Sequence, residues 1–170
     1  NAPELLPLDN LDAIVLTHAH VDHIAMLPVL FRYGYRGPVY CTPPTRDLMT
    51  LLQMDYIKVS QAEGADPPYS KADIQECIKH VVDIRWGDKT DIAPDIKITL
   101  ENAGHILGSS SVYMQIGEGN SEHRLLFSGD IKYERSWLFD AATVRFQKVE
   151  TLVIESTYGG AQDFQPNRAD

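Results

Sequence analysis

The sequence predicts an α/β fold in which sheets are flanked by helices. In its first half, apolar β-branched runs alternate with stretches of helical periodicity, and in its second half short strand-like runs are separated by turn residues. An apolar fraction of 44% in 170 residues is enough for the core of one ordinary domain. We therefore expect residues 1–170 to belong to a single domain.

The first half predicts the order strand, helix, strand, helix, over residues 11–17, 21–35, 37–42 and 45–64. The first run, LDAIVLT, is short, apolar and β-branched, as is typical of a buried strand. Apolar residues at helical spacing follow it up to Gly34, and the candidates for its buried face are Ile24, Leu27, Val29 and Leu30. Thr42 precedes a Pro-Pro pair, a pattern that favours the capped start of the long second helix.

The second half is strand-rich. Residues 65–70 predict a loop, and Ser70 with Asp73 three residues later predicts a capping box that opens another helix. The strand-like runs after it are residues 81–86, 95–103, 110–117, 123–129 and 150–157. Turn signals such as GEGNSE separate these runs. We expect functional loops where the strands end.

The composition limits the classes of function. Lys and Arg total 15 against 24 for Asp and Glu, and the net charge of −9 argues against broad nonspecific attraction to nucleic acid. A local site for nucleic acid is still compatible with this charge, because bound divalent metals would add positive charge there.

The sequence also argues against a membrane protein or a secreted one. No run approaches the roughly 20 apolar residues of a membrane span, and the opening NAPELLPLDN lacks the features of a signal peptide. Cys41 and Cys77 have no CxxC spacing, which favours free buried thiols. We expect a soluble cytoplasmic protein without membrane contact.

The segment HAHVDH concentrates three histidines and an aspartate at the end of the first predicted strand: His18, His20, Asp22 and His23. Such groups are costly to bury unpaired, so a metal ion is the expected partner. In an extended segment, alternate side chains share a face, so His18, His20 and Asp22 should converge while His23 points elsewhere as a helix begins. Imidazole and carboxylate without thiolate favour zinc, with manganese or iron as alternatives. The alternative to a metal site is that this segment caps a helix and that its histidines lie on the surface.

Two further candidate ligands follow predicted strands in the same way. His105 lies between Gly104 and Gly108, which permit tight turns and a close approach of the backbone, although a single histidine could be an ordinary polar residue. Asp130 follows the strand LLFSG, where an aspartate could instead form a turn. Together with the HAHVDH segment, they make six candidate ligands at three strand ends and predict a metal centre.

The motif series HAHVDH, GHILGSS and FSGD resembles that of the metallo-β-lactamase superfamily. The segments VIESTYGG and GYRGPVYCTPPTRDL are similar to its β-CASP nuclease branch, and specifically to archaeal homologues of the eukaryotic pre-mRNA 3′-end cleavage factor. The resemblance covers nearly the whole chain and implies an αββα sandwich of which residues 1–170 supply a part. We expect the early strands, the second half of the sandwich and a downstream β-CASP domain to lie outside this chain.

The resemblance also implies two zinc ions. His18, His20 and His105 would hold one ion, Asp22 and His23 the second, and Asp130 would bridge both. A further histidine expected downstream leaves the second site incomplete in this chain. Glu155 matches an acidic residue of the nuclease branch that positions a later, proton-donating histidine. Asp22 and Glu155 are the candidate catalytic residues, while His80 and His123 are predicted to be solvated.

The function implied by the resemblance is zinc-dependent hydrolysis of RNA, endonucleolytic or exonucleolytic, in RNA 3′-end processing or transcription termination. Single-stranded RNA is the expected partner, a homodimer through regions outside this chain is a further expectation, and this chain by itself is expected to be inactive. One alternative is a thioesterase- or lactam-type hydrolase on the same fold, which the ESTYG and PPTRDL segments disfavour. Another is a noncatalytic scaffold subunit, which the retention of six ligands disfavours.

Overall fold

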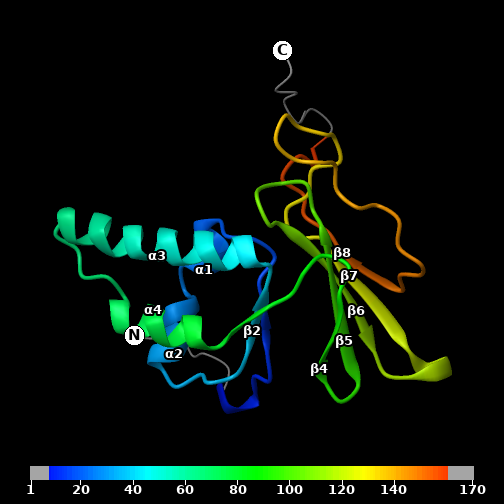
Figure 1. Cartoon of the computed structure of the whole chain (residues 1–170), viewed down its shortest axis with the longest axis horizontal. Helices are drawn as coiled ribbons and strands as arrows, with labels where there is room; N and C mark the ends of the chain where they lie inside the picture. Colours follow the sequence, from blue (N-terminus) through cyan, green and yellow to red (C-terminus); the bar gives the residue numbers. More distant parts are fainter. Residues whose placement is uncertain (1–7, 161–170) are drawn as a thin grey trace. The chain divides into compact units, whose positions relative to one another are not determined.

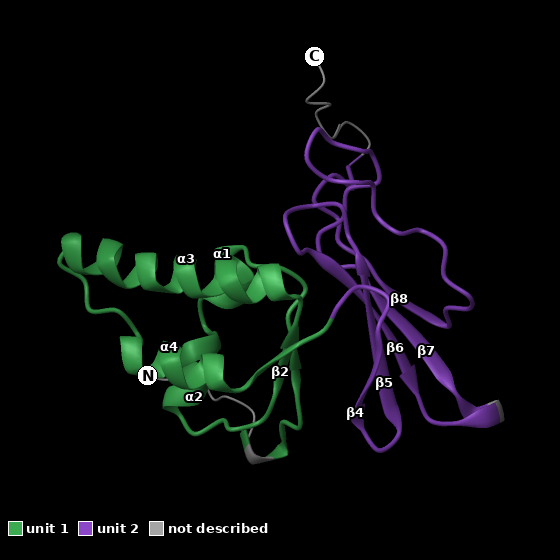
Figure 2. Cartoon of the chain, viewed as in Figure 1, with its two compact units in different colours: residues 1–84 green, residues 85–170 purple. Residues whose placement is uncertain are grey.

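The computed structural model describes residues 8–160. It divides into two compact units, residues 1–84 and 85–170, and each is described by itself (Figure 2). The prediction of one partial domain over residues 1–170 stays a prediction. Residues 1–7, part of the opening that predicted the absence of a signal peptide, lie outside the described residues, as do residues 161–170. Within residues 8–160, no helix combines the length and the apolar character that crossing a membrane requires.

The first unit packs helices against a three-stranded parallel sheet (Figure 1). Its elements are η1 (Leu8–Asn10), β1 (Ile14–Val15), α1 (Val21–Ile24), α2 (Leu27–Arg32), β2 (Val39–Cys41), α3 (Pro43–Ala62), α4 (Lys71–Lys79) and β3 (Val81–Asp83). The strand order is β1-β2-β3, with Ile14 opposite Val39 and Val39 opposite Val81. Because all three strands run in one direction, their carboxyl ends share one edge of the sheet. The HAHVDH segment leaves β1 at that edge.

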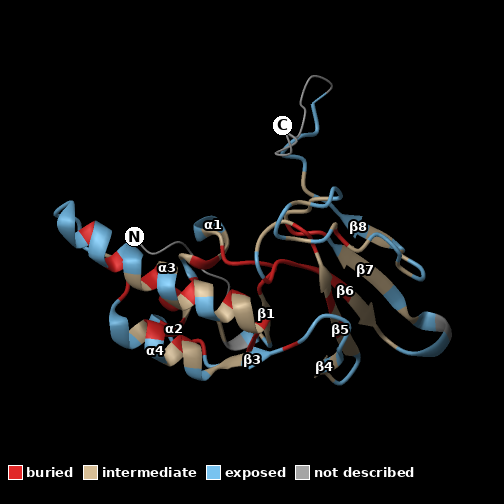
Figure 3. Ribbon diagram, turned by 45° about the horizontal axis from the view of Figure 1, so that its top comes forward, coloured by how far each residue is buried: buried red, intermediate tan, exposed pale blue. Residues whose placement is uncertain are grey.

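The core of this unit lies between the sheet and the helices, where Figure 3 shows buried residues on the inner sides of α2, α3 and α4. Its largest cluster includes Ile24, Leu27, Phe31, Tyr35, Val39, Cys41, Met49 and Cys77. Burying a large apolar side chain contributes about 1.5–3 kcal/mol, so this cluster is what fixes the short helices after β1. A buried hydrogen bond also joins α3 to α1, since Gln53 Nε2 donates to the carbonyl of Ile24 at 2.9 Å.

The predicted continuous helix over residues 21–35 is wrong, because the structure has two short helices there, α1 and α2, interrupted at residues 25–26. Pro28 lies in the first turn of α2, where its missing N–H costs nothing, whereas its ring would clash with the preceding turn of a continuous helix. Of the four candidates for the buried face, Ile24, Leu27 and Val29 are buried, and Leu30 is only partly buried.

The predicted helix starts are confirmed. Thr42 caps α3, its side-chain oxygen accepting from the Thr45 N–H, and two prolines occupy the first turn. At α4, Ser70 Oγ accepts from the Asp73 N–H at 3.4 Å while the Asp73 carboxylate accepts from the Ser70 N–H at 2.7 Å. This is the reciprocal capping box that the sequence predicted.

The second unit is a five-stranded sheet in the order β4-β5-β6-β7-β8. Its strands are β4 (Lys89–Ala93), β5 (Ile96–Asn102), β6 (Ser110–Ile116), β7 (His123–Phe127) and β8 (Thr151–Val153), with η2 (Gly119–Ser121) between β6 and β7. Strands β4 to β7 are antiparallel neighbours, and β8 is parallel to β7. Strands β5, β7 and β8 therefore run the same way, and the residues that follow them emerge at one edge. The sequence did not predict β4, the edge strand opposite β8, because its run KTDIA is half polar.

Candidate metal centre

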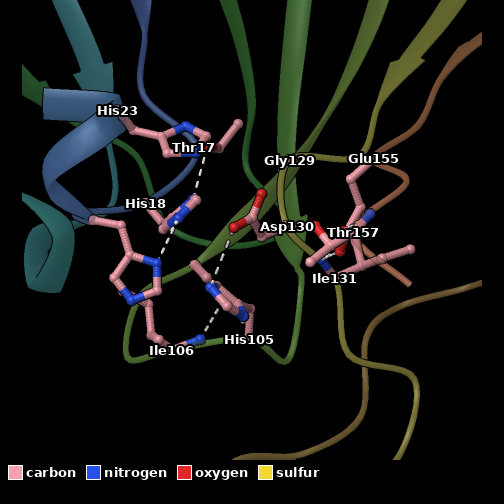
Figure 4. A network of polar contacts seen from close by, with 12 residues as sticks. Thr17, His18, His23, His105, Ile106, Gly129, Asp130, Ile131, Glu155 and Thr157 are labelled. Atoms are coloured by element: carbon pink, nitrogen blue, oxygen red, sulfur yellow. Dashed lines mark hydrogen bonds and ion pairs between the residues drawn. The ribbon is translucent and has the colours of Figure 1, made fainter. Parts of the chain in front are cut away.

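In the first unit, the histidine segment turns inward directly after β1. His18 is fully buried, and its Nδ1 lies 3.1 Å from the Thr17 hydroxyl oxygen (Figure 4). His18 Nε2 lies 3.1 Å from His20 Nδ1. Two imidazole nitrogens this close must either share a proton or direct their lone pairs at a common cation. If His18 Nδ1 carries the proton and donates to Thr17, its Nε2 is left as an acceptor facing His20.

The arrangement of Asp22 and His23 differs from the prediction. The ring of His23 lies 4.0 Å, centroid to centroid, from that of His18, so His23 joins the cluster instead of pointing elsewhere. The side chain of Asp22 is 78% exposed, and its Oδ2 lies 3.5 Å from His23 Nε2. The cause is the start of α1 at Val21, because a helix turns each successive side chain by about 100° and ends the alternation of an extended segment.

In the second unit, His105 lies in the tight loop between β5 and β6. The N–H groups of His105 and Ile106 both donate to Ser109 Oγ at 3.1 Å, and Ser109 is itself fully buried. The predicted role of the flanking glycines is confirmed, since Gly104 and Gly108 have φ of +69° and +77°. The fully buried Ser109 thus fixes the backbone that presents the imidazole.

Asp130 and His105 lie together in this unit, with 3.5 Å between Asp130 Oδ2 and His105 Nε2 (Figure 4). The buried Ser128 holds the strand end before Asp130. Its hydroxyl donates to the Gly129 carbonyl at 2.6 Å, and its own carbonyl accepts from Ser111 Oγ at 2.8 Å. The two side chains predicted to be ligands at separate strand ends are therefore brought together within one sheet edge.

Glu155 follows β8 and reaches back to the segment that carries Asp130. One carboxylate oxygen accepts from the Ile131 N–H at 2.9 Å and the other from the Thr157 N–H at 3.2 Å, while the Glu155 N–H donates to Ser128 Oγ at 3.1 Å. Burial by itself would raise the pKa of Glu155, but the hydrogen bonds from Thr157 and Ile131, together with the nearby His105, lower it below its ordinary value. Glu155 is therefore ionised at neutral pH. It contacts the chain on both sides of Asp130, through its carboxylate at the Ile131 N–H and through its own N–H at the Ser128 hydroxyl.

The chain's two thiols do not compete with these donors. Cys41 and Cys77 are free and buried, as the sequence predicted. Burial raises the pKa of each thiol to about 12, and the nearby Asp83 adds to the effect at Cys41. Neither forms a thiolate near neutral pH, so any metal would be held by nitrogen and oxygen donors.

Among the described residues, the side chains suited to hold a metal ion are His18 and His20 in the first unit and His105 and Asp130 in the second. Paired imidazoles and a carboxylate are the donor set that zinc accepts, so these residues fit the metal predicted from the sequence. His123 is exposed and bonds Thr151 at 2.9 Å, in keeping with the prediction that it is solvated. His80 is not: its side chain is 24% exposed and packs against the ring of Phe31.

The supporting hydroxyl groups of Thr17, Ser109 and Ser128 were not predicted from the sequence. Each lies within four residues of a candidate ligand and is buried. Short hydroxyl side chains next to histidine or aspartate at a strand end were the available signal. Such residues are common in loops, so only their burial distinguishes them.

Comparison with known proteins places these observations in a family. Residues 2–165 match the family model described as "Beta-lactamase superfamily domain". The chain is 53% identical over 168 residues to a transcription termination factor, FttA, of Methanothermobacter thermautotrophicus, and 52% identical over 170 residues to that of Methanocaldococcus jannaschii. It is 54% identical over 161 residues to the factor of Thermococcus kodakarensis. These matches cover 99%, 100% and 94% of this chain but 26%, 26% and 24% of the relatives, so the chain spans about a quarter of their length.

Proposed function

The chain belongs to the metallo-β-lactamase superfamily, and on that premise we propose that the protein containing it is a zinc-dependent hydrolase that cleaves single-stranded RNA in transcription termination or RNA 3′-end processing. The observation that carries the proposal is the contact of His18 Nε2 with His20 Nδ1 at 3.1 Å. A buried and a partly buried ring nitrogen aimed at each other are an arrangement that a bound cation stabilises. The naming of the relatives as transcription termination factors supports RNA as the substrate.

In this proposal the six ligands act as the motif series implies. His18, His20 and His105 would hold one zinc, Asp22 and His23 would serve the second, and Asp130 would be shared by both. Bound zinc would supply a hydroxide nucleophile at neutral pH and neutralise the charge that develops on the phosphodiester. Asp22 is exposed beside His23 and would need to turn toward the metal. The exposure of its side chain, at the first turn of α1, leaves room for that rotation.

The other residues of the centre hold these ligands in place. Thr17 fixes the ring orientation of His18, and Ser109 fixes the loop of His105. Glu155 holds the backbone of Ile131, next to Asp130. Outer residues of this kind typically change metal affinity or activity by about 10- to 100-fold when they are replaced. The cytoplasm is the proposed place of action, and the two free thiols fit a reducing compartment.

Cleavage of a labelled single-stranded RNA by the full-length protein tests the proposal. Asp130→Ala should abolish cleavage and reduce the bound zinc, because Asp130 is the ligand assigned to both ions. The matched control is Asp91→Ala, which removes an exposed carboxylate of β4 that pairs with Lys97 and should leave both measurements unchanged. Retained cleavage in Asp130→Ala would refute the assignment.

The same preparation separates the alternatives. Hydrolysis of a thioester or lactam with no action on RNA would favour another hydrolase of the superfamily. RNA binding without any zinc-dependent hydrolysis would favour a noncatalytic scaffold. Removal of zinc with a chelator should stop RNA cleavage, and its return should restore it.

A further inference from the structure

The segment that follows Asp130 is a long connection, and residues 131–148 contain neither helix nor strand (Figure 1). Its base is fixed by backbone hydrogen bonds. The Lys132 N–H donates to the Ala103 carbonyl at 2.9 Å, and the Ala142 N–H donates to the Lys132 carbonyl at 2.8 Å. Residues 132–142 thus form a closed loop, here called the 132–142 loop. It starts two residues after Asp130 and is tied to the backbone two residues before His105.

Close packing holds this base against the turn of His105. A Cβ atom at Gly104 would lie 2.5 Å from the Lys132 carbonyl oxygen and 2.7 Å from the Ala142 nitrogen. Only a glycine permits that approach. The base of the 132–142 loop is therefore adjacent to both candidate ligands of the second unit, and the position of its tip is set by the same backbone.

The tip presents large apolar side chains to solvent. Trp137 and Leu138 are 85% and 83% exposed, and Tyr133 is 66% exposed. Trp137 and Leu138 lie within a turn in which the Ser136 N–H donates to the Phe139 carbonyl at 2.9 Å and the Phe139 N–H to Ser136 Oγ at 3.0 Å. Exposed apolar side chains on a turn whose backbone is already ordered are typical of a binding site, because the turn needs little further ordering when a partner arrives.

Basic side chains lie next to the aromatic ones in this loop. Residues 132–142 contain two basic side chains, Lys132 and Arg135, and two acidic ones, Glu134 and Asp140, so the loop has no net charge, whereas the whole chain has a net charge of −9. Arg135 contacts Asp140 at 3.5 Å, but both side chains are more than 80% exposed. An exposed pair of this kind contributes little, so a phosphate can replace Asp140. Aromatic rings interleaved with basic residues are the combination that binds single-stranded nucleic acid.

We propose that the 132–142 loop holds single-stranded RNA, with an unpaired base stacked on Trp137 and phosphates contacted by Lys132 and Arg135. The inference rests on the proposed function and adds to it how the substrate is held beside His105 and Asp130. Stacking suits single-stranded RNA because every base has a face that an indole can cover, whatever the sequence. The remaining polypeptide of the full-length protein is the competing occupant of this tip.

The test is the affinity of the full-length, zinc-depleted protein for a labelled single-stranded RNA, measured by fluorescence anisotropy so that binding is observed without cleavage. Trp137→Ala should raise the Kd by about 5- to 150-fold, the range for one base stacked on an aromatic ring. Trp137→Phe retains an aromatic face and should restore most of the affinity. Tyr33→Ala removes a 56% exposed aromatic side chain at the end of α2 and should leave the Kd unchanged.

The outcomes distinguish this inference from the proposed function. An unchanged Kd in Trp137→Ala with a wild-type protein that binds RNA would overturn the loop assignment alone. A lower melting temperature with that unchanged Kd would identify the remaining polypeptide as the partner of the tip. A wild-type protein that fails to bind RNA would overturn both.

Discussion

Replacing Glu155 with glutamine tests whether this carboxylate holds the backbone beside Asp130. The wild-type side chain accepts from Ile131 at 2.9 Å and from Thr157 at 3.2 Å. Glutamine keeps one acceptor and places an NH2 group against the other N–H. A hydrogen bond to a charged group contributes about 1.5–3 kcal/mol and a neutral one about 0.5–1.5 kcal/mol. Because Glu155 is partly exposed, water replaces some of the loss, and we expect a local cost of about 1–2 kcal/mol.

Native-state hydrogen exchange measures this cost at the affected amides. A loss of about 1–2 kcal/mol should lower the protection of the Ile131 and Thr157 N–H groups by about 5- to 30-fold. The Gly87 N–H, which lies in the turn before β4 and is bonded to the Leu100 carbonyl of β5 at 2.9 Å, is the internal control and should be unaffected. Unchanged protection at Ile131 would show that Glu155 does not hold this segment, whatever happens to turnover.

Three further predictions concern stability. The pKa of Glu155 is lowered in the folded protein, so the ionised carboxylate stabilises the fold fully above the unfolded pKa, and this contribution is lost as pH falls through the lowered value. The difference in unfolding free energy between wild type and Glu155→Gln should therefore shrink below pH 4.5. A difference that stays constant with pH would argue against a role for the ionised group. Gly104→Ala should lower the melting temperature more than Gly64→Ala does. Both glycines have positive φ (+69° and +74°), but only at Gly104 would an added Cβ atom lie within 4 Å of backbone atoms. Equal losses of melting temperature would refute close packing at Gly104. Ser70→Ala removes the cap of α4 and should cost about 1 kcal/mol, or roughly 2–4 °C in Tm; an unchanged Tm would mean that the capping box contributes nothing.

The sequence by itself determined the features that depend on neighbours along the chain. The capping box of Ser70 and Asp73 was predictable because its hydrogen bonds join residues three apart. The buried thiols and the positions of most strands followed from local composition. The superfamily was predicted from three short motifs, and the match to residues 2–165 confirms it.

Tertiary structure decided the features that depend on distant pairing. The helical stretch after β1 is interrupted at residues 25–26, and the ring of His23 packs on that of His18, where an extended pattern predicted Asp22 to converge with it. The half-polar β4 becomes a strand only because β5 lies beside it. The parallel pairing of β8 with β7 brings Glu155 to Ile131, 24 residues away in the chain. Neither local propensity nor motif spacing encodes such a contact, because its free energy comes from sheet pairing and the burial of Ser128 between the strands.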